Sequence, residues 1–273
     1  SSAINAGNGA LALTQANNDF QGAVTVTGAG VSLVDVNNLS VTSLTDNANG
    51  NVSLVSGGTL TLPTSAVAAG TGNLTLASNG GALSTSNALS GTNVSLTGRD
   101  GVALGGNVSA LGTLELVSTN AAITQLAGNI AVAGLSTVTA GSGAITLGAA
   151  GNDFGGAVNL AGGATQITDQ NALTLGTLTT GALTAISTGA LNLGSGNVSG
   201  NLVATSNNGA INQAGALRVT GTSAINAGTD AITLTQANND FQGSVSATGT
   251  GVSITDANDL AIAGLNDGAN GTV

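Results

Sequence analysis

The feature that most constrains this chain is a long segment that occurs twice. Residues 2–52 align without a gap with residues 223–273, and 32 of the 51 aligned positions are identical. A shorter and more divergent copy covers residues 144–178. Long internal repeats are typical of architectures in which each unit buries its apolar face only against its neighbours. We therefore expect residues 1–273 to form a single repeat array.

A shorter unit recurs within this array, namely a turn rich in glycine and asparagine followed by a short strand of alternating apolar and polar residues. Such alternation sends successive side chains to opposite faces of a strand. The clearest strands follow one another at nearly equal intervals and begin at Val52, Leu74, Val94 and Leu114. We expect the series to continue less regularly at Leu135, Val158, Leu183 and Leu202.

Short strands, polar turns and a period of about 20 to 22 residues predict an all-β fold, a parallel β-helix or solenoid of roughly 13 coils. No segment shows sustained apolar spacing of the helical kind. The main alternative is an antiparallel β-sandwich, which would also place a turn every ~8 to 12 residues. A sandwich does not explain identity position by position over so long a segment.

The composition excludes several classes of protein. Hydrophobic residues make up 41% of the chain but include only three phenylalanines and no other aromatic residue, which predicts a thin aliphatic core. Charged residues make up 5%, and this low fraction argues against intrinsic disorder. Twelve acidic residues against two basic ones leave no basic patch for nucleic acid or anionic lipid. No apolar run reaches the ~18 residues of a membrane-spanning helix, so we expect no spanning segment.

The most specific local motif is Asn-Asp-Phe, which occurs once in each long copy. Its aspartate and phenylalanine positions are Asp19, Phe20, Asp153, Phe154, Asp240 and Phe241. A recurrent exposed phenylalanine could stack on sugar rings. The structural interpretation, which we favour, is a tight turn held by side-chain hydrogen bonds to the backbone, with the phenylalanine folded into the coil.

A second aspartate recurs in the three copies, each time two residues before an asparagine; these are Asp35, Asp169 and Asp256. The pattern Asp-x-Asn occurs in calcium loops, but the glycine and the downstream glutamate of such loops are absent. We therefore predict a turn-stabilising role for these aspartates and no metal site.

No catalytic, metal-binding or cofactor-binding residue is predicted. The chain has no histidine, cysteine or lysine, which removes most nucleophile–base pairs and most metal sites. A carboxylate pair of the kind used by polysaccharide-degrading enzymes is disfavoured because the carboxylates recur with the repeat. A predicted outward column of Ser53, Thr75, Ser95 and Glu115 is too mixed to favour ice binding.

Residues 18–24, 152–158 and 239–245, with the Ala-Ile-Thr-Leu lead-ins at 144–147 and 231–234, resemble large bacterial surface exoproteins. The resemblance is to filamentous-haemagglutinin-like adhesins that are secreted by the two-partner route. It implies a right-handed parallel β-helix that is exported by an outer-membrane transporter and projects from a Gram-negative cell. The secretion domain of that family is not in this chain, so an autotransporter passenger is a second possibility.

The expected function is that of a structural shaft segment of a secreted cell-surface adhesin, active in adhesion, cell–cell aggregation or biofilm-matrix attachment. Its expected partners are a polysaccharide or another cell surface, and no enzymatic activity or cofactor is expected. The alternative is a carbohydrate-binding β-helix module, with ice binding and polysaccharide degradation as remote options. Val273 aligns with Val52 in mid-strand, so we expect a piece of a longer shaft whose uncapped coils associate end to end.

Overall fold

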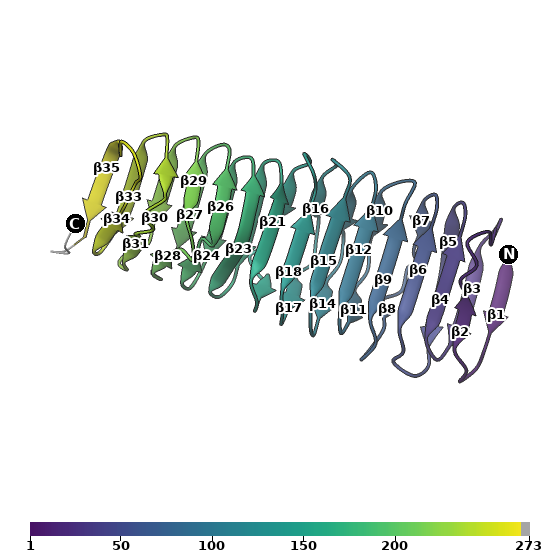
Figure 1. Cartoon of the computed structure of the whole chain (residues 1–273). Helices are drawn as coiled ribbons and strands as arrows, with labels where there is room; N and C mark the ends of the chain where they lie inside the picture. The colour runs from purple at the N-terminus through teal and green to yellow at the C-terminus, as the bar shows by residue number, and fades with distance from the viewer. Residues whose placement is uncertain (269–273) are drawn as a thin grey trace. The chain divides into compact units, whose positions relative to one another are not determined.

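The computed structural model describes residues 1–268, which form β-strands and turns and contain no helix (Figure 1). The chain is a β-solenoid of about 13 coils in which strands of successive coils pair in parallel, and the predicted fold class is confirmed. Its contacts divide it into two compact units, residues 1–143 and 144–273. The end of the last long copy, with Val273, lies outside the described residues.

In unit 1 the strands recur in a cyclic order of three sides, and one turn through the three sides makes a coil. The first side contains β2 (Leu11–Leu13), β4 (Val31–Asp35), β6 (Val52–Ser56), β9 (Leu74–Ser78), β12 (Val94–Gly98), β15 (Leu114–Ser118) and β18 (Ser136–Thr139). The second contains β1 (Ser2–Asn5), β3 (Val24–Gly28), β8 (Val67–Ala68), β11 (Leu89–Gly91), β14 (Val108–Ala110) and β17 (Ile130–Val132). The third contains β7 (Leu60–Thr61), β10 (Leu83–Thr85), β13 (Val102–Leu104) and β16 (Ile123–Gln125). Strand β5 (Leu39–Asp46) serves two sides, because its first residues pair with β7 and the rest with β3.

Unit 2 repeats this organisation. One side contains β19 (Ile145–Leu147), β22 (Thr165–Asp169), β24 (Leu183–Ser187), β27 (Leu202–Ser206), β30 (Ser223–Asn226), β33 (Val245–Gly249) and β35 (Ile262–Asp267). The next contains β21 (Val158–Gly162), the end of β23 (Leu173–Thr180), β26 (Ser195–Val198), β29 (Leu217–Val219) and β32 (Asp240–Phe241). The last contains the start of β23, then β25 (Leu191–Asn192), β28 (Ile211–Asn212), β31 (Ile232–Leu234) and β34 (Val252–Ile254). The short strand β20 (Asp153–Phe154) precedes β21.

The core consists of columns of aliphatic side chains that stack from coil to coil. Val52 pairs with Leu74, Leu74 with Val94 and Val94 with Leu114, and all four are buried. The predicted register of these strands is therefore confirmed. Alternate residues of each strand point inward, and each buried valine or leucine contributes about 1.5–3 kcal/mol of transfer free energy relative to an exposed one.

The predicted continuation of this series is wrong at Leu135. Leu114 pairs with Ser136, and Leu135 is 44% exposed. A one-residue shift moves every side chain of a strand to the opposite face. Val138 is fully buried in the observed register, and it would face solvent if Leu135 pointed inward. The strand therefore takes the register that buries Val138, and Leu135 points outward as a result.

In unit 2 the predicted series mixes two sides of the solenoid. Val158 pairs with Leu175 on the side of β21, whereas Leu183 pairs with Thr165 and Leu202 on the side of β22. The coils also vary in length more than predicted, since the step from Leu173 to its partner Leu191 is shorter than the step from Ser2 to its partner Val24. Shorter coils arise where one long strand, such as β23, serves two sides.

The long repeat does not return to the same side of the solenoid. Val158 and Val245 occupy the same position in two copies. Val158 lies on the side of β21 and β26, but Val245 lies on the side of β22 and β30. The distance along the chain from Val158 to Val245 therefore corresponds to four coils and one further side. Equivalent surface residues of these two copies face different directions.

Candidate functional site

The two recurrent aspartate positions of the long repeat belong to one structural element. In each copy the second aspartate accepts a hydrogen bond from the backbone N–H of the motif phenylalanine, which lies earlier in the chain, in the preceding coil. The N···O distances are 2.9 Å for Phe20–Asp35, 2.6 Å for Phe154–Asp169 and 2.7 Å for Phe241–Asp256. We call this element the carboxylate-clamped turn.

The second carboxylate oxygen of each clamp closes a local turn. Asp35 Oδ1 accepts from the N–H of Asn37 at 2.8 Å, and Asp169 and Asp256 make the same bond to the N–H two residues on at 2.6 and 2.8 Å. This Asx-turn explains why an aspartate precedes each of these corners. Each carboxylate thus joins two coils through backbone groups alone.

Serine occupies the corresponding corner in neighbouring coils. Asp35 pairs with Ser56, Ser56 with Ser78, and Asp169 with Ser187, and all three serines are buried. Ser56 Oγ accepts from Leu39 N–H at 3.1 Å and donates to Thr59 O at 2.9 Å. A hydroxyl is therefore sufficient between ordinary coils. The longer aspartate is used where the preceding coil contains the Asn-Asp-Phe turn.

The asparagine just before the motif aspartate is a further part of the element, and its contacts between coils are not predicted from the sequence. Asn239 is fully buried, and its Nδ2 donates to Leu234 O at 3.1 Å while its Oδ1 accepts from Leu217 N–H at 3.0 Å. Asn18 and Asn152 also donate to the carbonyl five residues earlier, at 3.0 and 3.2 Å. The signal that marks this position is its identity in all three copies.

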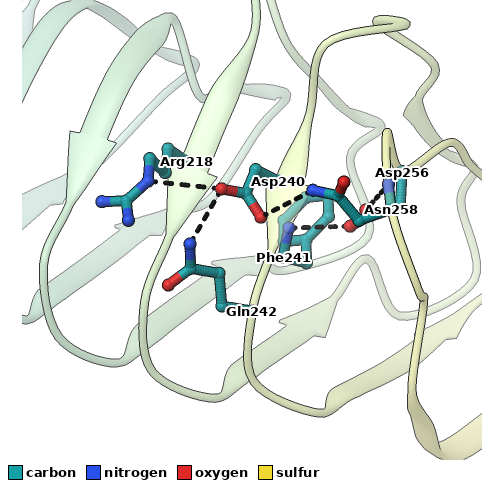
Figure 2. A network of polar contacts seen from close by, with 6 residues as sticks. All are labelled: Arg218, Asp240, Phe241, Gln242, Asp256 and Asn258. Carbon is teal, nitrogen blue, oxygen red and sulfur yellow. Dashed lines mark hydrogen bonds and ion pairs between the residues drawn. The ribbon is translucent and has the colours of Figure 1, made fainter.

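The first aspartate of the motif faces outward and takes part in polar contacts on the surface. Figure 2 shows these contacts around Asp240. Its Oδ2 lies 3.2 Å from Arg218 Nε and accepts from Gln242 Nε2 at 2.9 Å, and its Oδ1 accepts from Asn258 Nδ2 at 3.4 Å. The Arg218 side chain is half exposed, so this ion pair stabilises the fold by less than about 1 kcal/mol.

The three phenylalanines differ in their surroundings. Phe154 and Phe241 are each 1% exposed and are the largest buried side chains of the core. Phe20 is partly exposed. A shallow groove of about 400 Å³ lies beside it and is lined by Asp19, Phe20, Gln21, Gly22, Ala23, Asn37, Asn38 and Ser40.

The remaining predicted positions form a regular polar surface. Ser53, Thr75, Ser95 and Glu115 are in register in one outward column, as predicted, and Ser95 Oγ donates to Glu115 Oε2 at 2.8 Å.

Among residues 1–268 no three histidine, cysteine or acidic residues gather in a metal-like group. No helix in this range is long and apolar enough to cross a membrane. The carboxylates of the clamped turns are therefore engaged with the backbone rather than with one another.

The clamps are expected to support stability. Asp169 is 1% exposed and accepts from two N–H groups, whereas a serine offers one shorter acceptor, so Asp169→Ser leaves at least one of the N–H groups of Phe154 and Asn171 without a partner. An unsatisfied buried donor costs about 1–3 kcal/mol, and we expect Asp169→Ser to lower the free energy of unfolding by that amount. Urea denaturation followed by far-UV circular dichroism measures this change. The matched control is Asp153→Ser, which removes a neighbouring carboxylate that disfavours the charge of Asp169 and should cost less than about 0.5 kcal/mol.

The pH dependence of stability is expected to include a contribution from Asp169. Burial raises the pKa of this carboxyl above its ordinary value, the N–H groups of Phe154 and Asn171 partly oppose the shift, and the charge of Asp153 adds to it. The folded state therefore binds this proton more readily than the unfolded state. The resulting stabilisation is fully present below the ordinary pKa and is lost as the pH rises through the raised one.

Comparison of the wild-type chain with Asp169→Asn, from a pH below the ordinary pKa of aspartate to a pH above the raised pKa of Asp169, isolates the contribution of this carboxyl to stability. The unfolding free energy of the wild type, minus that of the variant, should fall as the pH rises. A difference that stays constant or increases with pH would show that burial does not dominate the environment of Asp169.

The fold and the clamped turn define a β-solenoid repeat protein. Residues 1–27, 91–161 and 180–248, more than half of the chain, match a family described as repeats of unknown function (DUF5649), and the chain belongs to this family. Each matched segment contains one Asn-Asp-Phe turn close to its end. No curated protein and no solved structure matches the chain.

Proposed function

We propose that this chain is a structural shaft segment of a secreted adhesin on the surface of a Gram-negative bacterium. The observation that carries the proposal is the use of the recurrent polar residues. Asp35, Asp169 and Asp256 bond backbone groups of adjacent coils, and two of the three motif phenylalanines are buried. The most specific motif of the sequence therefore holds coils together, which is the role of a scaffold.

Two general properties support the same proposal. Coils that contact only their neighbours can fold in sequence along the array, which suits a protein that leaves an outer-membrane transporter unfolded and folds outside. The absence of cysteine means that no disulfide must form or be reduced on that route. The resemblance of the Asn-Asp-Phe unit to filamentous-haemagglutinin-like adhesins is our basis for proposing secretion by the two-partner route. It is also our basis for proposing a role in adhesion, aggregation or matrix attachment.

The second candidate function is binding of an exopolysaccharide. The observation in its favour is the groove beside Phe20, where a partly exposed aromatic ring lies among a carboxylate and several amides. Carbohydrate recognition uses such combinations of a ring face and polar groups. The shaft proposal assigns these residues to the packing of coils, so the two candidates differ in what the groove does.

Calorimetric titration of the chain with bacterial exopolysaccharide fractions separates the two candidates. The shaft proposal predicts no saturable binding. Saturable binding at micromolar affinity would contradict it, and loss of that binding in Gln21→Ala, a variant at an exposed residue, would place the sugar in the groove. The control variant is Gln242→Ala, which changes the equivalent residue of another copy.

A further inference from the structure

Residues 18–21 present a set of groups that another copy of the same motif uses to hold the preceding coil. The ten residues 13–22 are identical to residues 234–243. In the later copy, Leu217 N–H donates to Asn239 Oδ1 at 3.0 Å, and Gln242 N–H donates to the carbonyl of Val219 at 2.9 Å. These bonds attach strand β29 to the motif.

Side chains complete the contact in the later copy. Val219 pairs with Phe241, whose ring is 1% exposed, and Arg218 pairs with Asp240 with its Nε 3.2 Å from the carboxylate (Figure 2). Strand β29 therefore brings an apolar–arginine–apolar sequence, in parallel and in a fixed register, to the Asn-Asp-Phe turn. One of the two arginines of the whole chain lies at this contact.

The first copy has the same internal geometry, but no strand of residues 1–268 pairs with it on that side. Asn18 Nδ2 donates to Leu13 O, and Phe20 N–H donates to Asp35, as in the later copy. Within residues 1–268, Asn18 Oδ1 and the N–H of Gln21 have no hydrogen-bond partner. The Phe20 ring is partly exposed, and in the described part of the chain the Asp19 carboxylate forms no ion pair with an arginine.

We propose that residues 18–21 form a docking edge for a coil of this same repeat type, whose strand carries the apolar–arginine–apolar pattern of residues 217–219. The strand adds in parallel, its first N–H bonds Asn18 Oδ1, its last carbonyl accepts from Gln21, and its arginine lies beside Asp19. This is strand addition at a sheet edge, with backbone bonds for affinity and side chains for register. The inference concerns assembly of coils and does not depend on the adhesive role.

The test adds a coil to the chain. Residues 202–222 precede Ser223, which is equivalent to Ser2, so a second copy of 202–222 can be joined directly to Ser2 of the full chain. Because the protein has three phenylalanines, labelling with fluorophenylalanine gives three fluorine resonances, and Phe20→Leu assigns one of them. We expect the solvent-isotope shift of the Phe20 resonance to fall to the level of Phe154 and Phe241. The equilibrium constant for unfolding should fall at least tenfold.

Variants of the added coil test its chemistry. Val219→Asp in the added coil should leave the Phe20 resonance as exposed as in the unextended chain. Arg218→Glu should weaken the stabilisation several-fold, because it faces Asp19 with a like charge, whereas Arg218→Lys should retain most of it. An unchanged Phe20 resonance in the extended chain, or equal stabilisation by the Glu and Lys versions, would overturn the proposal.

Discussion

Replacing Leu54 with aspartate is expected to abolish cooperative folding of unit 1. Leu54 is fully buried in the middle of β6 and is in register with Leu33 and Leu76 of the adjacent coils. Among the described residues of the chain, no cation lies in this column to pair with a carboxylate. An uncompensated charge in such a site costs more than about 4 kcal/mol, a large part of the stability of a typical domain.

The neighbouring residue provides the matched control for this substitution. Ser53 lies on the opposite face of the same strand, in the outward column between Ser32 and Thr75. We expect Ser53→Asp to change the unfolding free energy by less than about 0.5 kcal/mol. Far-UV circular dichroism during urea denaturation measures both variants. Similar losses for Leu54→Asp and Ser53→Asp would contradict the inward and outward assignment of the strand.

The second large effect is expected at a buried phenylalanine. Phe241 fills the interior of its coil and is 1% exposed, so Phe241→Ala removes most of a large apolar side chain and leaves a cavity. Such substitutions cost about 3–5 kcal/mol. The same measurement on Phe20→Ala should show a distinctly smaller loss, because Phe20 is already partly exposed.

This pair of variants also separates the two candidate functions. A scaffold role predicts that Phe241→Ala lowers stability, and that no ligand binding is lost with it. A carbohydrate-binding role predicts that Phe20→Ala abolishes binding while the unfolding free energy stays close to that of the wild type. Equal destabilisation by the two substitutions would contradict the difference in burial between the two copies.

The regular part of the fold could be predicted from the sequence because its cause is local. Strands such as β6, β9 and β12 alternate strictly, and turns of glycine and asparagine separate them at nearly constant steps. Alternation determines which residues face inward, and a constant step determines which residues stack. The column from Val52 to Leu114 follows from these two facts alone.

The exceptions could not be predicted because they depend on competition between neighbours. The sequence pattern predicts that Leu135 points inward, but the strand takes the register in which Val138 is fully buried. The copies of the long repeat lie on different sides because strands such as β23 pair on two sides of the solenoid. No residue type in the sequence indicates where β23 passes from one side to the next.

The clamped turn was predictable only in part. The recurrence of Asp169 indicates a turn, and the turn is observed, but its bond to Phe154 N–H joins two successive coils. A prediction of that bond requires the register between the two coils. The buried amide of Asn239 is beyond prediction for the same reason, since its partner Leu217 lies in another coil.

The claim that the coils of this chain are interchangeable is tested by the deletion of one coil. Val94 pairs with Leu114, so removing residues 94–113 takes out one complete coil and brings Leu114 next to Leu74. We expect this variant to unfold cooperatively with β-sheet circular dichroism, whereas removal of residues 94–103 alone should abolish cooperative unfolding, because it places the wrong sides against one another. Cooperative folding of both variants, or of neither, would contradict the claim.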